Sequence, residues 1–285
     1  MKHKFLILAL FIATISFSQT STDVYVYKLS KANGVFAITS GKNISNNPGY
    51  DSQPHFYSRK SIVYASNQNG QTEIAKYDIA SGKTSYVSNT TQGSEYSPQR
   101  IPNSKNISAV RLDKSGLQRF YKYDLKTKTS KLILTKLKVA YPFWYAKNLA
   151  INVVIVGNEL HLIQSELRSI SHTTIDKNVG RSVHRIPNTN LVSYVRKSAS
   201  KWEIRSLDPK TKKTTFIVNS MEKKEDVCWL PDGTLLLAKG SSLFKFNPKT
   251  DTTWSLFHTF SENQHKNISR IVVNKKGNLI ALVSE

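Results

Sequence analysis

Short apolar stretches recur along the chain, each bounded by Asn, Gly, Lys or Ser residues that favour turns. They are four to six residues long and rich in Val, Ile, Leu and Tyr, which is the composition of β-strands. The stretches cover residues 62–65, 107–110, 151–156, 191–195, 235–238 and 279–283. No stretch after residue 18 is long and apolar enough to span a bilayer as a helix. The pattern therefore predicts an all-β protein.

The apolar stretches are evenly spaced. The positions just upstream of them are Pro54, Pro98, Pro142, Val183, Val227 and Ile271, separated by 44, 44, 41, 44 and 44 residues. A fixed period of this length indicates a repeat architecture.

Each repeat carries the same order of signals. A second alternating strand follows the apolar stretch, as in residues 73–78, and a tight turn then leads to a third strand, as in residues 85–87. Three antiparallel strands in about 44 residues are the content of a propeller blade. We expect the apolar stretch to be the innermost strand and the segment before it to lie at one rim. The turns are opened by Asp78, Asp124, Asp208 and Asn247, whose side chains can accept hydrogen bonds from the turn backbone.

The two ends of the chain complete each other. Residues 268–285 carry only the beginning of a repeat, and residues 23–40 carry only the end of one, with a turn at Asn33 and Gly34. Five whole repeats and one shared repeat make six blades, and the sharing removes the open sheet edges of a partial ring. The sequence predicts a six-bladed β-propeller whose last blade is closed by the N- and C-terminal strands.

The repeats resemble the TolB-type WD-like repeat, whose pattern is D-x-x-P-x-[FW]-S-P-D-G before an apolar strand. The first copy is DSQPHF at residues 51–56, and partial copies lie at residues 95–98, 142–144 and 229–233. The leading acid is replaced by Val139, Gly180 and Lys224 in later repeats, so the repeat is diverged. The resemblance implies a binding scaffold of the bacterial envelope, because members of this class are mostly envelope proteins that bind other proteins. The separate N-terminal α/β domain of TolB has no room in this chain.

The first residues predict a cleaved signal peptide. Residues 1–4 are basic, residues 5–15 are apolar, and Ser16 and Ser18 flank Phe17, which places cleavage before Gln19. The alternative is a retained membrane anchor, although the apolar run is shorter than the roughly 20 residues of a spanning helix. No Cys follows the run, so lipid attachment is not encoded. We expect a periplasmic or secreted protein in which residues 19–285 form one TolB-like propeller.

Composition adds a strong positive charge. The chain has 285 residues with 41 Lys+Arg against 19 Asp+Glu, a net charge of +22. Without residues 1–18 the charge is 39 minus 19, or +20. The single Cys excludes a disulfide framework and a thiolate zinc site. Many of the lysines lie at predicted turns, for example residues 122–138, where they are solvated and discourage edge pairing.

Catalytic chemistry has little support in the sequence. No G-x-S-x-G elbow is present, and the histidines at positions 55, 161, 172, 184, 258 and 265 lack the close spacing of common metal motifs. The repeat geometry can nevertheless bring His55 and His184 to one channel. We expect no catalytic residues, no metal and no cofactor. The alternative is a metal-dependent propeller lyase or hydrolase that acts on an anionic glycan.

A binding role is better supported. The segments just before the apolar stretches are rich in Trp, Tyr and Arg, the residue types concentrated at contact surfaces. The binding candidates at the rim or channel are His55, Tyr96, Arg100, Tyr141, Trp144, Arg181, His184, Arg185, Trp229 and Arg270. Phe56, Trp144 and Trp229 share one repeat position, where packing between blades is the favoured interpretation. Arg100 and Arg185 hold that position in other blades, and we expect them to contact solvent or ligand because burial would require a paired acid.

The expected partner follows from location and charge. An envelope protein or an anionic polymer fits an exported basic propeller. The positive electrostatic field of the protein would speed the encounter with such a partner more than it would define specificity. Export and the absence of a recognition-helix signal argue against nucleic acid. We expect a monomer with no membrane span after signal cleavage.

Overall fold

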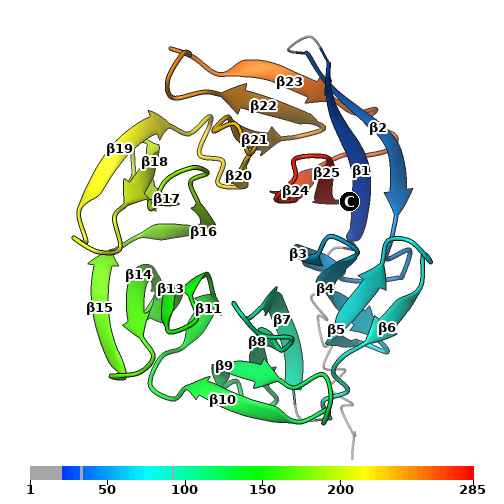
Figure 1. Ribbon diagram of the computed structural model, residues 1–285, viewed down its shortest axis with the longest axis vertical. Helices are drawn as coiled ribbons and strands as arrows, with labels where there is room; N and C mark the ends of the chain where they lie inside the picture. The colour runs from blue at the N-terminus through cyan, green and yellow to red at the C-terminus, as the bar shows by residue number, and fades with distance from the viewer. Residues whose placement is uncertain (1–20, 33–34, 92) are drawn as a thin grey trace, which may run out of the picture.

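The computed structural model describes residues 21–32, 35–91 and 93–285, and these form six antiparallel sheets arranged as blades around a central axis (Figure 1). The predicted all-β, six-bladed propeller is confirmed. The predicted signal peptide of residues 1–18 and the turn at Asn33 and Gly34 lie outside the described residues. In the described part of the chain, no helix is long and apolar enough to cross a membrane.

The five blades within the chain run outward from the axis in sequence order. The first comprises β3 (Ser52–Ser58), β4 (Ser61–Gln68), β5 (Gln71–Asp78) and β6 (Thr84–Tyr86). The second comprises β7 (Gly93–Arg100), β8 (Ile107–Asp113), β9 (Gln118–Tyr123) and β10 (Ser130–Leu134). The third comprises β11 (Val139–Tyr141), β12 (Trp144–Ala146), β13 (Leu149–Val156), β14 (Glu159–Glu166) and β15 (Ser171–Asp176). The fourth comprises β16 (Val179–Arg185), β17 (Val192–Lys197), β18 (Trp202–Leu207) and β19 (Thr214–Asn219). The fifth comprises β20 (Val227–Trp229), β21 (Leu235–Lys239), β22 (Ser242–Phe246) and β23 (Ser255–Thr259).

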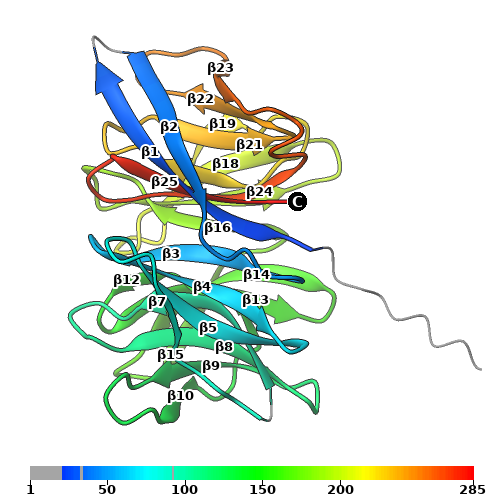
Figure 2. The same cartoon turned by 90° about the vertical axis from the view of Figure 1, so that its right-hand side faces the viewer.

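The closing blade joins the two ends of the chain. It is ordered β2 (Val35–Asn43), β1 (Asp23–Ala32), β25 (Leu279–Ser284) and β24 (Ile268–Val273), with β24 innermost. The antiparallel register between β1 and β25 runs from Asp23 opposite Ser284 to Lys28 opposite Leu279. Figure 2 shows β1 alongside β25, where it closes the ring.

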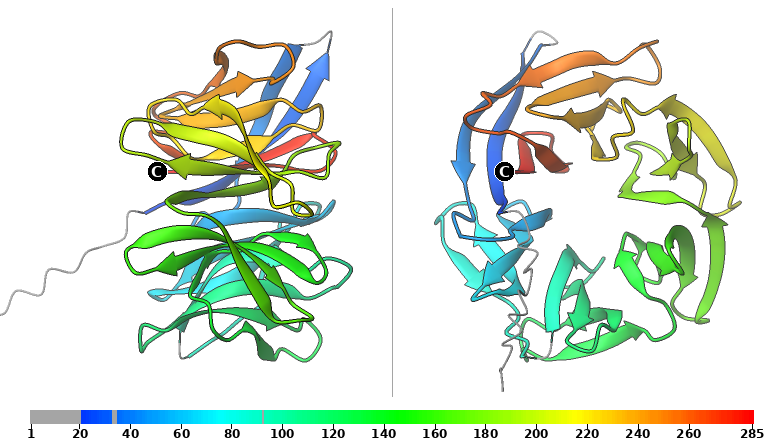
Figure 3. Two further views of the ribbon diagram at one scale, coloured as in Figure 1. Left: turned by 90° about the vertical axis from the view of Figure 1, so that its left-hand side faces the viewer. Right: turned by 180° about the vertical axis from the view of Figure 1, so that it is seen from behind.

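The five blades within the chain have at least one more strand than the three that the sequence predicts. The apolar stretches are the second strands, and the segments upstream of them form the innermost strands β3, β7, β11, β16, β20 and β24. Bulges interrupt the registers of β3, β7 and β16, and these inner strands are rich in polar residues, so they lack the alternation that marks a strand in sequence. Residues expected at a rim therefore line the channel itself. Figure 3 shows the same ring from behind.

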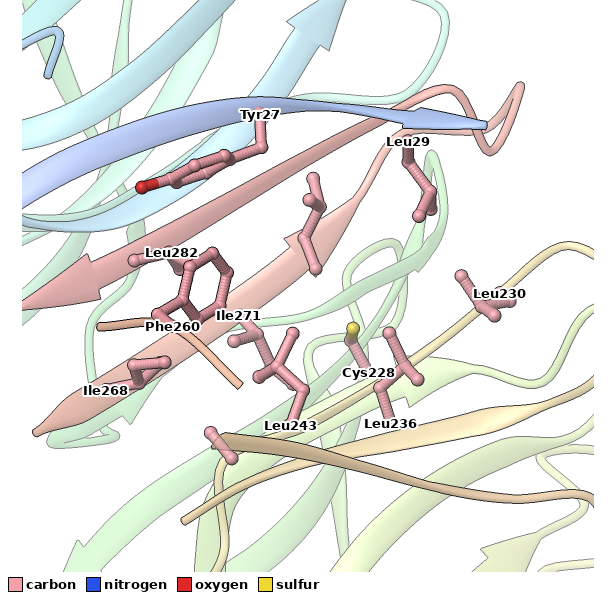
Figure 4. Packing of buried hydrophobic residues seen from close by; sticks show 12 residues of the cluster. Tyr27, Leu29, Cys228, Leu230, Leu236, Leu243, Phe260, Ile268, Ile271 and Leu282 are labelled. Atoms are coloured by element: carbon pink, nitrogen blue, oxygen red, sulfur yellow. The ribbon is translucent and has the colours of Figure 1, made fainter. Parts of the chain in front are cut away.

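The hydrophobic core is divided among the spaces between neighbouring blades. One cluster lies between the fifth blade and the closing blade and contains Tyr27, Leu29, Leu236 and Ile271 (Figure 4). Cys228, a free thiol, is buried in the same cluster, and burial raises the pKa of the thiol. Apolar side chains on both faces of each second strand explain why these strands read as continuous apolar runs.

A buried histidine fastens the closing strands to the preceding loop. The His265 Nε2 atom lies 2.5 Å from the Tyr27 hydroxyl on β1, and its Nδ1 atom lies 2.9 Å from the Ser284 hydroxyl on β25. His265 is fully buried, and burial lowers its pKa to about 4. The neutral ring therefore connects the first and last strands of the chain at neutral pH.

The turn acids behave as predicted. The Asp124 carboxylate accepts hydrogen bonds from the backbone N–H groups of Lys126 and Thr127 at 2.9 and 3.1 Å, and Asp208 accepts one from Lys210 at 2.9 Å. These hydrogen bonds lower the pKa values of Asp124 and Asp208.

Candidate functional site

The inner segment of every blade presents one repeat position to the channel, and bulges interrupt five of the six inner strands. The register shifts between Ser52 and His55 in β3 and between Tyr96 and Gln99 in β7, and the same occurs in β11, β16 and β24. A bulge bends its strand and redirects side chains. One repeat position, directly before Pro54, Pro98, Pro142, Val183, Val227 and Ile271, is held by Gln53, Ser97, Tyr141, Ser182, Asp226 and Arg270, and all six line one cavity of about 290 Å³.

The backbone at several of these positions is constrained. Gln53, Ser97 and Arg270 have φ values of 57°, 49° and 129°, which residues with a Cβ adopt rarely. Such strain persists where the surrounding structure fixes it, and it clusters at functional sites. At these three channel-lining positions the backbone is held in an unfavourable conformation, which indicates that the direction of their side chains matters for function.

An ion-pair network from three successive blades occupies one side of the cavity. Arg181 on β16 donates from Nε to Asp226 Oδ1 at 3.0 Å and from Nη2 to Oδ2 at 2.7 Å. Arg270 on β24 donates from Nη1 to the same Oδ1 at 3.1 Å. Burial raises the pKa of Asp226, and the Arg181 charge opposes that rise. Two guanidinium groups thus share a single carboxylate, which is a geometry suited to planar, bidentate recognition.

A second acid supports the network from behind. Glu225 Oε2 accepts the backbone N–H of Arg181 at 2.9 Å and lies 2.9 Å from the Lys197 ammonium. Glu225 Oε1 lies 3.6 Å from Arg181 Nε. The network therefore contains three cations, Arg181, Arg270 and Lys197, against two carboxylates, which leaves one net positive charge.

Two neutral histidines face the same cavity. His55 and His184 both line it, as the repeat geometry allows. Burial lowers the pKa of each ring to about 4, and for His55 the neighbouring His184 adds to the effect. Both rings are uncharged at neutral pH and can donate or accept hydrogen bonds.

The sequence-derived candidates divide into two groups. Those that line the cavity are His55, Arg100, Tyr141, Trp144, Arg181, His184 and Arg270. Tyr96, Arg185 and Trp229 do not line it. Among the lining residues that the sequence analysis missed, Asp226 is central, and its place before Val227 in the 44-residue period is the signal that marks it.

The tryptophans pack between blades. The Trp144 indole N–H donates to the Ser108 hydroxyl at 2.8 Å, and the Trp229 indole N–H donates to the Ser193 hydroxyl at 2.8 Å. Each hydrogen bond reaches from one blade to the second strand of the preceding blade. The favoured packing interpretation is confirmed for both residues, although Trp144 also presents surface to the cavity.

Arg100 and Arg185 repeat one contact in two blades. Arg100 stacks on the Tyr57 ring at 5.1 Å, and Arg185 stacks on the Tyr145 ring at 4.1 Å. Arg185 also donates to the Tyr145 carbonyl at 2.6 Å. Both arginines are exposed, as expected, but each joins its blade to the one before it. This contact gives both arginines a structural role between blades.

The donor set of the cavity fits an anion better than a metal. A divalent cation would compete with two arginines for Asp226, and the remaining nitrogen donors are His55 and His184. Within residues 21–32, 35–91 and 93–285, no group of three or more His, Cys, Asp or Glu side chains is arranged to hold a metal ion.

Comparison with known proteins gives likeness of fold. No family model matches the chain, and no curated protein matches it in sequence. A structure assigned as TolB from Agrobacterium tumefaciens has a TM-score of 0.69 at 10% identity, covering 93% of this chain and 98% of that one. TolB from Acinetobacter baumannii has a TM-score of 0.59 at 14% identity, covering 92% of this chain and 64% of that one.

An enzyme is among the similar structures as well. Oligogalacturonate lyase in complex with manganese has a TM-score of 0.58 at 14% identity, covering 88% of this chain and 82% of that one. The chain shares its propeller fold with TolB and with this lyase. At these identities the likeness establishes fold alone, so function has to be argued from the channel.

Proposed function

We propose that the protein is an exported binding propeller of the bacterial envelope, and that its channel receives a carboxylate-bearing segment of a partner protein. The observation that carries this proposal is the shared Asp226, held by Arg181 and Arg270 from two different blades. A site that already binds one carboxylate between two guanidinium groups has the chemistry to bind another.

Arg270 is the residue best placed to contact a ligand. Within the described residues its guanidinium makes one hydrogen bond, to Asp226, although it carries five N–H donors. Its side chain lies 5.6 Å from the Tyr141 ring, which also lines the cavity. A partner carboxylate would find unused donors beside an aromatic surface and two neutral histidines.

The repeat resemblance supports a protein partner. The TolB-type pattern implies an envelope binding scaffold, and the predicted signal peptide is consistent with export. The net charge favours an acidic partner, because a positive field speeds encounter with an anionic segment.

Capture of envelope proteins by purified variants tests the proposal. Arg270→Ala is expected to lose the captured partner, because it removes the unused donors from the channel. Arg196→Ala is the matched control, since Arg196 is half-exposed and pairs with Asp176 at 3.7 Å outside the cavity. Equal capture by wild type and Arg270→Ala would overturn the assignment of the channel as the binding site.

A second candidate is an enzyme for an anionic glycan. The fold likeness to oligogalacturonate lyase favours it, and uronic acids carry the same carboxylate chemistry. The arginine-held Asp226 argues against a divalent metal in this channel. Incubation with oligogalacturonate, with and without manganese, distinguishes the two candidates, because elimination yields an unsaturated product that absorbs ultraviolet light.

A further inference from the structure

A second cavity lies between the first and second blades, which are neighbours in the ring (Figure 1). Its volume is about 590 Å³, and none of the residues that line it also lines the channel cavity. Sites for small molecules commonly occupy about 300–1,000 Å³. The cavity is therefore large enough for a ligand of its own, separate from the partner segment proposed for the channel.

The two walls of this cavity differ in chemistry. The second blade supplies two cations, Arg111 on β8 and Lys128 in the turn between β9 and β10. The first blade and the linker that follows it, residues 87–91, supply neutral side chains: Gln68, Tyr86, Ser88, Asn89, Thr90 and Thr91. Among the described residues, no Asp or Glu lines the cavity. This division suits a ligand with an acidic group at one end and hydroxyl groups at the other.

Arg111 is held in one orientation by its neighbours. Its Nε donates to Asp113 Oδ1 at 2.8 Å, and its guanidinium carbon lies 3.8 Å from the centre of the Tyr121 ring. Arg119, opposite Arg111 in the register of β8 and β9, donates to Asp113 Oδ2 at 3.1 Å. Two like charges directly opposite each other are unfavourable, and here they share a single carboxylate. The Nη groups of Arg111 have no partner among the described residues, so they are available to an anion.

A nearby acid does not occupy the place of such an anion. Glu95 stands opposite Arg111 in the register of β7 and β8, but it is fully buried and does not line the cavity. Its Oε1 atom accepts the Tyr123 hydroxyl at 2.8 Å inside the interface between the blades. The cations of the cavity wall therefore face the cavity without a carboxylate in front of them.

The linker wall is fixed in place from behind. Glu73 on β5 is buried, and it accepts the Ser88 hydroxyl at 2.6 Å and the Thr90 backbone N–H at 2.9 Å. The side chains of Asn89 and Thr91 line the cavity and have no hydrogen-bond partner among the described residues. A fixed backbone with unused amide and hydroxyl groups is a preorganised surface for the hydroxyl groups of a ligand.

We propose that this cavity binds a phosphorylated sugar, with the phosphate against Arg111 and Lys128 and the sugar hydroxyls against the linker. Two cations balance a group with two negative charges, and a phosphate monoester carries about −1.5 to −2 at pH 7. Arginine binds phosphate through two parallel N–H donors, and lysine adds a point charge. The Tyr86 side chain, 39% exposed, offers a ring for the apolar face of the sugar.

Isothermal titration calorimetry with glucose 6-phosphate tests the site, with glucose and inorganic phosphate as partial ligands. We expect glucose 6-phosphate to bind at least about tenfold more tightly than either partial ligand, because only the complete molecule contacts both walls. Absence of glucose 6-phosphate binding would overturn the proposal. Equally tight binding of inorganic phosphate would overturn it as well, because the cavity would then hold any small anion.

Arg111→Gln is expected to weaken the binding of glucose 6-phosphate by about tenfold or more, because it removes the oriented phosphate donors. Arg119→Gln is the matched control. It removes the same charge from the same Asp113 pair, but Arg119 does not line the cavity, so affinity should stay within about twofold of wild type. Equal losses in the two variants would overturn the assignment of Arg111 as a phosphate ligand.

A second pair of variants guards against misfolding of Arg111→Gln. Lys128 is exposed in a turn, so Lys128→Gln should keep the wild-type melting temperature and weaken glucose 6-phosphate binding by about threefold to tenfold. Lys126→Gln changes an exposed lysine of the same turn that does not line the cavity, and it should bind as wild type does. Equal affinity in Lys128→Gln and Lys126→Gln would contradict the proposed position of the phosphate.

Discussion

Arg181 binds Asp226 through two hydrogen bonds, 3.0 and 2.7 Å long, across the boundary between the fourth and fifth blades. This ion pair joins adjacent blades near the axis. Because Arg270 shares the same carboxylate, the three side chains together carry a net positive charge in the channel.

Asp226→Asn is expected to destabilise the fold by about 3 kcal/mol, because it leaves two guanidinium groups in the channel without their carboxylate. Chemical denaturation with a two-state fit measures this loss. Asp232→Asn is a suitable control, since Asp232 makes a surface ion pair with Lys31 and its loss should cost less than about 1 kcal/mol. Equal costs for the two variants would show that the channel pair contributes no more than a surface pair.

The same Asp226→Asn variant is expected to bind a polyanionic probe more tightly than wild type, because the network then has three cations against one carboxylate. Titration with poly-aspartate should give a gain of about threefold to tenfold that diminishes with added salt. Unchanged affinity would mean that the probe binds elsewhere, for example at the turn lysines.

Trp229→Phe is expected to lower the free energy of unfolding by about 2 kcal/mol, because it opens a small cavity and leaves the buried Ser193 hydroxyl without its indole donor. Trp144→Phe removes the equivalent hydrogen bond to Ser108 at a less buried position and should cost less. Thermal unfolding of both variants checks the order, and a larger loss for Trp144→Phe would contradict it.

Acid is expected to weaken the protein through its buried histidines. The pKa values of His55, His184 and His265 are about 4 in the folded protein, below the ordinary 6.5, so their neutral forms stabilise the fold above pH 6.5. As pH falls from 6.5 to 4, the unfolded chain binds protons that the folded chain does not, and stability declines.

His265→Gln should reduce that acid sensitivity, although it also loses stability at neutral pH because His265 joins Tyr27 to Ser284. Denaturation midpoints measured at several pH values give the slope. If the stability of the His265→Gln variant falls with pH as steeply as that of wild type, His265 does not contribute to the acid sensitivity.

The blade number could be read from the sequence because the second strand of every blade is buried on both faces and appears as an apolar run with a 44-residue period. The innermost strands could not be read in this way. In β3 and β7 most residues are polar, and bulges at positions such as Gln53 and Ser97 break the alternation, because residues of these strands line the channel.

The candidate site was only partly predictable for a related reason. Arg181, Arg270, His55 and His184 are conspicuous residue types in the inner segments, so composition identified them. Asp226 was not identified, because turn acids such as Asp124 and Asp208 outnumber it and carry the same side chain. Only the fold brings it between two arginines from neighbouring blades.

Site-specific photocrosslinking tests the central claim most directly. A photoreactive phenylalanine analogue at Tyr141 lies in the channel, and the same analogue at Tyr86 lies at the periphery, where the side chain is 39% exposed. We predict that an envelope protein crosslinks from position 141, not from position 86, and that Arg270→Ala abolishes the crosslink. Crosslinking from position 86 alone, or a crosslink at position 141 that survives Arg270→Ala, would contradict the account.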